Sequence, residues 1–293
     1  LSKHAAGFVI GDDDLTKYIP LMRPVKNKPG KKKNQVEQEV SIDTTDTMMF
    51  TQYPMDDLEE LGLIKMDFLA LETLTIIQDC IKLIQKYENI DVTTNVTYNN
   101  LLSPAAYSLM SLGNTLGVFQ CESPGLRHLL MQIRPEQFSD VVAAIALYRP
   151  GPMDAIDEAT GMTMMDKYVQ NRTFKRQDES FTWEVLHPEM DDILKETYGI
   201  IIYQEQIMDI CRKVCGYTNN EADKFRKAVG KKIPELVAKE KKAFMKGALG
   251  QGSMAQDDAD KLFGQLETFA RYGFNKSHAA AYAVLTYRTA WLK

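Results

Sequence analysis

The sequence predicts an α+β chain: a strand-and-loop region over residues 1–70, then a large, mostly α-helical domain over residues 71–293. Residues 63–69 read as a strand with a side-chain period of about 2. After Phe68 the apolar residues recur with a period of about 3.6, as in helices that bury one face. A hydrophobic fraction of 44% and a charged fraction of 26% are ordinary for a globular protein, and 293 residues suffice for two domains.

Three segments of the first region are predicted strands: HAAGFVI (4–10), MMFTQYP (48–54) and GLIKMDFL (62–69). A Lys-rich run with Pro and Gly, RPVKNKPGKKKNQVEQ (23–38), separates the first two. We predict that this run is a mobile loop. It is either solvated or in contact with a phosphate backbone.

Asp67 lies inside the mostly apolar run LIKMDFLALETLTII (63–77). In a strand, Lys65 and Asp67 share one face while the alternate residues on the other face are apolar. A lone carboxylate in a buried strand is costly to desolvate unless it is paired or binds a metal. The alternative is a solvated Lys65–Asp67 pair at a sheet edge, and the local pattern leaves both open.

The second region begins with an amphipathic helix, LETLTIIQDCIKLIQKY (71–87). Ser103-Pro104 opens another helix, with Pro at its first position. The RPGP motif (149–152) cannot be helical throughout, because each Pro restricts the residue before it. Arg149 in this rigid turn suits either a ligand contact or a domain corner.

The stretch FRKAVGKKIPELVAKEKKAF (225–244) combines basic residues with two helix ends. One helix is predicted from an N-cap at Asn219 or Asn220 to Gly230, and Pro234 starts the next. Helix N-terminal amides together with ammonium groups suit a phosphate. The basic side chains there either bind phosphate or form a solvated joint; they are Arg226, Lys227, Lys231 and Lys232.

A second such place is YGFNKSHAAAYAVLTY (272–287), where Ser277 is the predicted cap of a helix that follows Gly273. Lys276 stands at the helix N-terminus, and His278 and Tyr282 share one face four residues apart. The three alanines between them leave room for a bulky, flat partner, or else they form a close helix contact. Gln204, after the apolar run YGIII, either positions polar groups or is an ordinary surface residue.

Several functional classes find no support in the sequence. No Walker A, GxGxxG, HExxH or nucleophile-elbow motif occurs, and a net charge of −5 gives no global attraction to nucleic acid. No apolar run reaches about 18 residues, so no membrane span is expected. The four cysteines lack a zinc spacing and are predicted to be reduced cytosolic thiols. Both termini look cut, which predicts an internal fragment.

Seven motifs in this order carry a resemblance that spans Lys3 to Lys293: HAAGFVI, GLIKMDFLALETLTII, GVFQCESPGLRHLL, ALYRPGPM, TYGIIIYQEQIMDI, EADKFRKAVGKKIPE and FARYGFNKSHAAAYAVLTYRTAWLK. Together they resemble the catalytic alpha subunits of bacterial DNA polymerase III, the replicative C-family polymerases, in their DnaE form. Two departures stand out. Ala70 replaces the usual Gly, and residues 153–180 differ from the family pattern.

The resemblance implies that residues 1–70 are the C-terminal part of a polymerase-beta-like palm and that residues 71–293 are the fingers. It implies that Asp67 is one of three aspartates that hold two Mg²⁺ ions and that Lys65 is the lysine before it. The other two aspartates belong to an upstream D-x-D pair, which this sequence lacks. Carboxylate oxygens suit Mg²⁺, which keeps waters and substrate phosphates as its other ligands. The fragment alone is therefore expected to be inactive.

The resemblance also implies the substrates and partners: dNTP and primer–template DNA. It places the incoming triphosphate at the basic fingers residues Arg226, Lys227, Lys231, Lys232, Lys276 and His278. Tyr282 would pack against the nascent base pair or sugar, and Arg149 and Gln204 would line the site. A sliding clamp, a clamp loader and a proofreading exonuclease would bind parts of the protein not present here. The implied location is the bacterial cytoplasm, at the nucleoid, with no membrane partner.

Three hypotheses about function follow. The first is a DNA-directed DNA polymerase that adds dNTPs to a primer 3′-hydroxyl by two-metal nucleotidyl transfer, either as the main replicase or as an error-prone relative. The second is a non-catalytic nucleotide- or DNA-binding module that keeps the fingers alone. The third is a helical scaffold protein.

Overall fold

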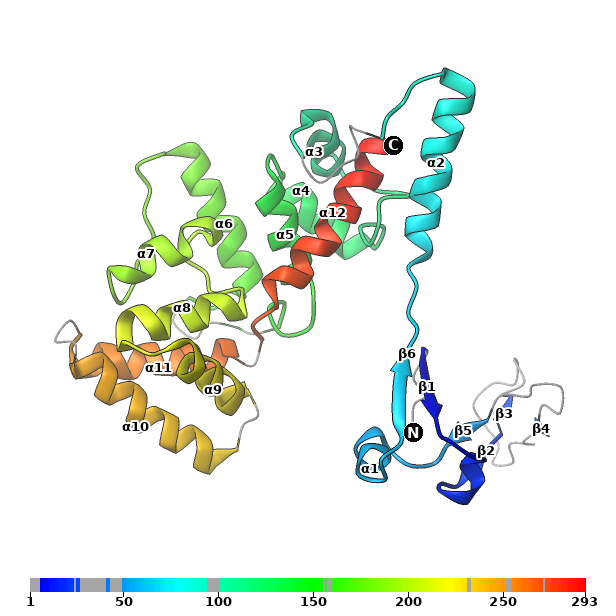
Figure 1. Cartoon of the computed structure of the whole chain (residues 1–293). Coiled ribbons are helices and arrows are strands. Elements are labelled where there is room, and N and C mark those ends of the chain that lie inside the picture. Colours follow the sequence, from blue (N-terminus) through cyan, green and yellow to red (C-terminus); the bar gives the residue numbers. More distant parts are fainter. Residues whose placement is uncertain are drawn as a thin grey trace, which may run out of the picture. The chain divides into compact units, whose positions relative to one another are not determined.

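The computed structural model describes residues 6–23, 25–26, 41–42, 49–93, 101–154, 156, 160–230, 233–250, 254–270 and 272–293. The chain divides into two compact units, Leu1–Glu72 and Thr73–Lys293 (Figure 1). The described strands belong to the small unit, and the large unit is built from helices. The predicted α+β class is confirmed.

The small unit contains three two-stranded antiparallel pairs among the described residues. They are β1 (Gly7–Ile10) with β6 (Ile64–Asp67), β2 (Leu21–Met22) with β5 (Phe50–Thr51), and β3 (Val25–Lys26) with β4 (Ser41–Ile42). The short helices η1 (Leu15–Lys17) and α1 (Met55–Glu60) complete the unit. Its core is small and consists of Ile19, Leu58 and Leu63, with Val9, Leu15 and Leu21 packed against them.

Two of the predicted strands are confirmed as β1 and β6, and the third shrinks to the two residues of β5. The predicted loop 23–38 is corrected at Val25–Lys26, because these residues pair with Ser41–Ile42. Apart from Arg23, Val25 and Lys26, this loop lies outside the described residues.

The strand β6 is exposed on its apolar face. Met66 lies opposite Phe8 in the β1–β6 register, and both side chains are more than 40% exposed. Lys65 lies opposite Val9, which packs against the small core. The apolar alternation of 63–69 therefore does not correspond to a buried face in the described unit. A solvated setting for Asp67 is the one observed.

The helices of the large unit form two clusters around separate cores. The first cluster contains α3 (Pro104–Ser111), α4 (Pro124–Ile133), α5 (Phe138–Leu147), α6 (Met164–Gln177) and α12 (Lys276–Leu292). The second contains α7 (Glu189–Leu194), α8 (Gln204–Cys215), α9 (Asn219–Gly230), α10 (Pro234–Gly250) and α11 (Gln256–Ala270). The remaining elements are α2 (Glu72–Glu88), at the start of the unit, and η2 (Lys195–Thr197).

In the first cluster α12, drawn in red, runs beside α3 and α5 (Figure 1). Ala279 and Ala283 are fully buried and share the core with Ala143 and Ala144 of α5. Small side chains at a helix contact allow the two axes to approach closely. The alanine run predicted to admit a bulky ligand is therefore partly occupied by α5. Ala281, by contrast, is exposed.

In the second cluster three phenylalanines form the centre of the core. Phe225 of α9, Phe244 of α10 and Phe263 of α11 have ring centroids 5.6 to 6.0 Å apart. All three are at most 3% exposed. This core holds α9, which carries two of the predicted phosphate-binding residues.

The predicted helix starts at Pro104 and Pro234 and the predicted end at Gly230 are confirmed, but two predicted N-caps are wrong. Thr218 caps α9, because its Oγ1 accepts from the Glu221 amide at 3.3 Å while Glu221 Oε2 accepts from the Thr218 amide at 2.8 Å. Asn275 caps α12 in place of Ser277, since its Oδ1 accepts from the His278 amide at 2.8 Å. Both predicted caps already lie inside their helices.

Candidate functional site

Two chain segments that are far apart in sequence meet in the large unit: the residues before α8 and those before α12. Tyr203 and Phe274 form a parallel bridge. The Gln204 amide donates to the Phe274 carbonyl at 2.9 Å, and the Phe274 amide donates to the Ile202 carbonyl at 2.9 Å. Residues 272–278, here named the junction segment, therefore continue from a fixed backbone pairing into α12.

Arg149 holds the junction segment from the side of the RPGP turn. Its Nε donates to the Ala146 carbonyl at 2.8 Å, and its Nη2 donates to the Tyr272 carbonyl. The guanidinium carbon lies 4.6 Å from the centroid of the Phe274 ring, a cation–π contact. Burial lowers the pKa of Arg149, but a guanidinium stays charged at neutral pH. These contacts direct Arg149 to the protein backbone.

Gln204 and Asp223 hold Arg226 from two elements. Arg226 Nη1 donates to Gln204 Oε1 at 3.1 Å, and Nη2 donates to Asp223 Oδ1 at 2.7 Å. Lys227 Nζ lies 2.7 Å from Asp223 Oδ2. The hydrogen bonds from Lys227 and then Arg226 lower the pKa of Asp223, which keeps this carboxylate ionised. The Arg226 side chain is 23% exposed, so part of it faces solvent.

The N-terminus of α12 already carries protein acceptors. Both carboxylate oxygens of Glu205 accept from the Lys276 amide, at 3.1 and 3.0 Å. Lys276 Nζ forms an ion pair with Glu196 and lies 5.4 Å from the centroid of the Tyr203 ring. An anion that binds at Lys276 must therefore displace Glu196.

A pocket of about 510 Å³ adjoins Lys276 and has a mixed charged lining. Its carboxylates are Asp192, Glu196, Glu205 and Asp209, and its ammonium groups are Lys195, Lys213 and Lys276. Acidic groups outnumber basic ones, so this pocket does not favour a polyanion. The Arg226 side of the junction segment is the better place for one.

Four aromatic rings form a row along the start of α12. His278 lies 4.3 Å from Tyr282 between ring centroids and 5.5 Å from Phe274. Phe119 lies 5.6 Å from Tyr282 on the other side. The Phe119 amide donates to Thr289 Oγ1 at 2.9 Å, which ties this loop to α12. An exposed His278 and a half-buried Tyr282 leave part of the row open to solvent.

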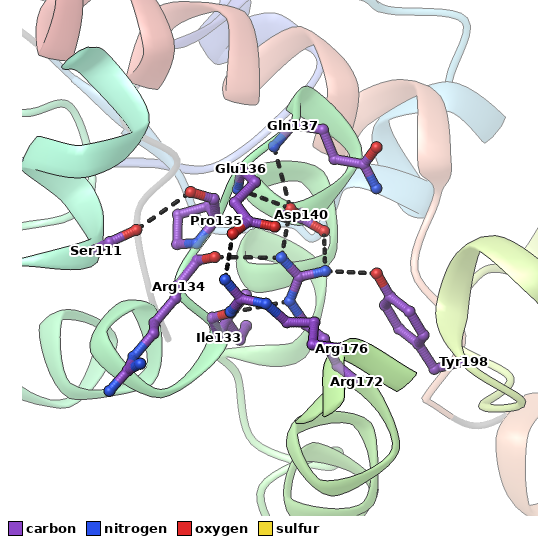
Figure 2. A network of polar contacts seen from close by, with 10 residues as sticks. All are labelled: Ser111, Ile133, Arg134, Pro135, Glu136, Gln137, Asp140, Arg172, Arg176 and Tyr198. Atoms are coloured by element: carbon purple, nitrogen blue, oxygen red, sulfur yellow. Dashed lines mark hydrogen bonds and ion pairs between the residues drawn. The ribbon is translucent and has the colours of Figure 1, made fainter. Parts of the chain in front are cut away.

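A buried ion pair supports the chain before Gln204 (Figure 2). Arg172 Nη1 lies 2.8 Å from Asp140 Oδ1, and their side chains are 4% and 1% exposed. Arg172 Nη1 also donates to the Tyr198 hydroxyl, and Arg172 Nε donates to the Ile133 carbonyl at 2.8 Å. Asp140 accepts from the Glu136 amide at 2.9 Å. The network thus joins α5 and α6 to Tyr198, where the run that leads to Gln204 begins.

In the small unit Asp67 is paired with Lys65. Lys65 Nζ lies 2.7 Å from Asp67 Oδ1, and the Asp67 side chain is 51% exposed. Among the described residues no group of three or more His, Cys, Asp or Glu side chains is arranged to hold a metal ion. Asp67 fits as a single carboxylate ligand. The described residues alone do not provide the ligand set that two Mg²⁺ ions need.

The junction segment brings together most of the predicted nucleotide-binding residues: Arg149, Gln204, Arg226, Lys276, His278 and Tyr282. Lys227 shares Asp223 with Arg226. Lys231 and Lys232 lie outside the described residues, and Lys65 and Asp67 belong to the small unit.

Sequence reasoning missed four residues of this arrangement: Phe119, Glu205, Asp223 and Phe274. Asp223 was open to prediction, because it stands three and four residues before Arg226 and Lys227 on one helix face. Glu205 and Phe274 lie inside motifs that were singled out, but no local pattern pairs them with residues about 70 positions away.

Two family models match most of the chain. Residues 73–252 match the bacterial DNA polymerase III alpha subunit finger domain, and residues 1–70 match the bacterial DNA polymerase III alpha NTPase domain. The first of these matches alone covers more than half of the chain.

Curated relatives named DNA polymerase III subunit alpha are similar over 99–100% of the chain. The protein of Xylella fastidiosa (strain 9a5c) is 41% identical over 297 residues, which cover 99% of this chain and 22% of that protein. The Aquifex aeolicus (strain VF5) protein is 40% identical and the Thermus aquaticus protein 39%, each over 100% of this chain and 22% and 21% of the relative. The chain therefore spans about a fifth of these relatives. It belongs to the bacterial DNA polymerase III alpha subunit family, with a finger domain over residues 73–252.

Proposed function

We propose that this chain is the nucleotide-selecting part of a DNA-directed DNA polymerase that acts in chromosomal replication. Residues 1–70 are the end of the palm, and residues 71–293 are the fingers. The observation that carries the proposal is the junction segment, which carries Lys276 and part of the aromatic row and to which Gln204 links Arg226. Cations and aromatic rings side by side suit a ligand with a phosphate chain and a flat base.

Arg226 and Lys227 bind the incoming triphosphate. Asp223 and Gln204 fix the Arg226 guanidinium before any ligand arrives, so little reorganisation is needed when the phosphates bind. Lys231 and Lys232 follow on the same basic joint. Lys276 contributes to phosphate binding once its ion pair with Glu196 is replaced by one with a phosphate oxygen. His278 completes the phosphate-facing set, and Tyr282 packs against the nascent base pair or the sugar.

The palm part contributes Asp67 as one ligand of the two-metal centre. When bound, two Mg²⁺ ions stabilise the 3′-alkoxide of the primer and the leaving pyrophosphate. The remaining ligands come from aspartates outside this sequence, and Lys65 stays paired with the Asp67 carboxylate until a metal competes for it. The 293-residue chain alone is therefore inactive as a polymerase.

The proposal includes the partners of a replicative polymerase. Primer–template DNA and dNTP bind to the chain itself. A sliding clamp, a clamp loader and a proofreading exonuclease bind elsewhere on the complete protein, at the nucleoid in the bacterial cytoplasm. Among the described residues no helix has the length and apolar character needed to cross a bilayer.

Binding of Mg²⁺–dATP to the 293-residue chain, measured by calorimetry, tests the fingers assignment. Arg226→Gln should weaken binding about 10- to 100-fold, the value of a charge-assisted hydrogen bond of about 1.5–3 kcal/mol. Arg212→Gln is the matched control, because Arg212 forms the same i,i+3 ion pair with Asp209 on α8. Equal affinities for Arg226→Gln and the unmodified chain would refute the assignment.

Primer extension by the complete gene product tests the palm assignment. Asp67→Asn should abolish extension while DNA binding stays intact. If the variant extends primers as well as the unmodified protein, Asp67 is structural. Templated extension by the 293-residue chain alone would contradict the predicted inactivity.

The second candidate function is a non-catalytic nucleotide- or DNA-binding module. It is favoured by the setting of Asp67, whose half-exposed carboxylate is paired with Lys65 and, among the described residues, belongs to no group of three metal-binding side chains. If the complete gene product binds DNA and dNTP but never extends a primer with Mg²⁺, this second function is correct.

A further inference from the structure

We propose that Gln204 is a positioning residue that locks the phosphate-facing Arg226 to the junction segment and does not itself touch the nucleotide. This inference rests on the proposed function. It gives Gln204 a different role from the ligand-lining one that the family resemblance implies.

The two ends of the Gln204 side chain bond to two different elements. Its Oε1 accepts from Arg226 Nη1 of α9 at 3.1 Å, and its Nε2 donates to the Gly273 carbonyl at 3.0 Å. A guanidinium can only donate and a carbonyl can only accept, so this orientation of the amide satisfies both partners and the flipped one satisfies neither. The side chain is therefore a bridge with a defined direction.

The backbone of Gln204 adds a third bond to the same segment. Its amide donates to the Phe274 carbonyl at 2.9 Å, so one residue pairs with two consecutive carbonyls, Gly273 and Phe274. A Cβ at Gly273 would lie 3.1 Å from Gln204 Cγ, which shows how closely the two segments approach. Arg149 holds the preceding carbonyl, that of Tyr272. The junction segment is thus fixed at three successive peptide groups.

The Gln204 side chain sets the spacing between Arg226, which is proposed to bind phosphate, and the aromatic row, which is proposed to pack against the base. Arg226 is oriented by Asp223 on its own helix and by Gln204 on α8. The aromatic row starts at Phe274, whose backbone Gln204 also holds. A ligand that contacts both Arg226 and Tyr282 therefore meets them at a spacing that Gln204 fixes. Since the polar atoms of Gln204 are engaged in these bonds, it acts through Arg226, which it ties to the junction segment.

A double-mutant cycle on Mg²⁺–dATP affinity of the 293-residue chain tests this role. Gln204→Leu keeps the approximate size of the side chain and removes both polar ends. It should weaken binding about tenfold, and Arg226→Gln should weaken it at least as much. If Gln204 acts through Arg226, the double variant should bind within about threefold of Arg226→Gln alone.

If the affinity losses of the two single variants multiply in the double variant, the positioning role is wrong. Multiplied losses are expected if Gln204 contacts the nucleotide directly or if its replacement unfolds the chain. An unchanged affinity in Gln204→Leu would overturn the positioning role as well. If Arg226→Gln has no effect, the proposed function fails and the positioning role fails with it. If Arg226→Gln weakens binding and the effects multiply, only the positioning role fails.

Two further variants keep the test decisive. Gln265→Leu changes an exposed glutamine on α11 and should leave dATP affinity unchanged. If Gln204→Leu does not fold, Gln204→Asn retains an amide that is one methylene too short to reach both partners. It should give the same non-additive cycle with Arg226→Gln, and additive effects would refute the role.

Discussion

Arg172 and Asp140 form an ion pair that is almost fully removed from solvent. Such a pair adds little to folding stability compared with apolar residues of the same size. Removing one partner is nevertheless costly, because the other charge then remains buried and unpaired in a low dielectric. Asp140 keeps two backbone donors before α5, the Glu136 and Gln137 amides, but these do not replace the positive charge of Arg172. This residue pair therefore controls whether the run from Tyr198 to Gln204 keeps its position.

Arg172→Leu should lower the free energy of unfolding by about 3–5 kcal/mol, because the buried Asp140 loses its partner. Arg176→Leu is the control on the same helix. Its ion pair with Glu136 is exposed, so its loss should cost at most about 1 kcal/mol. Urea unfolding measures both, and equal losses in the two variants would contradict the burial argument.

Gly151 stands where the RPGP turn meets the junction segment. Its φ is +107°, and a Cβ there would lie 2.4 Å from the Tyr272 ring. Gly151→Ala should therefore cost the strain of a left-handed residue, about 1–2 kcal/mol, and also push Tyr272 aside. Gly161→Ala is the control, because its φ is +68° with no atom within 4 Å of the added Cβ.

Both glycine variants should lose stability in urea unfolding, but only Gly151→Ala should also weaken dATP binding. Arg149 holds the Tyr272 carbonyl, so a displaced Tyr272 moves the junction segment. Loss of affinity in Gly161→Ala of the same size would show that strain alone, and not the displacement, is responsible.

At the scale of elements, the helix ends that border the site decide its electrostatics. At the α12 N-terminus the Lys276 amide already donates to Glu205 and the His278 amide to Asn275, so these two amides are not free for a phosphate. The α9 helix instead presents Arg226 and Lys227 from its last turns, held by Asp223. The main phosphate-binding element is therefore expected to be α9, with α12 contributing Lys276, His278 and the ring of Tyr282.

The reciprocal bonds between Thr218 and Glu221 fix the start of α9. Thr218→Ala should destabilise the chain by about 1 kcal/mol, the usual value of an N-cap. Asn220→Ala, a change inside the helix, should cost far less or even stabilise it, since Ala is the better helix former. Thermal unfolding of the two variants checks this, and the reverse order would restore Asn220 as the cap.

At the scale of the whole molecule, the large unit buries groups that ionise at alkaline pH. Burial raises the pKa of Cys121 and of Cys215 to about 12 and raises that of Cys211 as well. In the unfolded chain the pKa of a thiol is about 8.5. The folded state therefore keeps its full stability below about pH 8.5. Stability is lost as the pH rises toward 12, because in this range only the unfolded state releases the thiol protons.

The free energy of unfolding should fall between pH 8.5 and 10.5 by up to about 1.4 kcal/mol per pH unit for each buried thiol. Urea titrations at a series of pH values measure this slope. Replacing Cys121 and Cys215 by Ala should flatten it. A slope that does not change in the double variant would assign the loss to other groups, such as the buried tyrosines.

Several features of this chain were set by short stretches of sequence. The periodicity of 71–87 predicts α2, Ser103-Pro104 predicts the start of α3, and Gly230 and Pro234 mark the joint between α9 and α10. These signals are local, since a helix depends on residues three and four apart and on its caps. The same locality explains the two wrong caps, because neighbouring polar residues compete for the same amides.

The sequence by itself thus determined the α+β class, most helix boundaries and, through seven ordered motifs, the polymerase III alpha family. Only the tertiary structure decided what the polar side chains bind. Gln204 meets Gly273 across 69 positions, and Lys276 meets Glu196 across 80. Arg149 reaches Tyr272 across 123 positions. No local pattern encodes such pairs, because they depend on how two separate helix cores pack and bring distant segments within hydrogen-bonding distance.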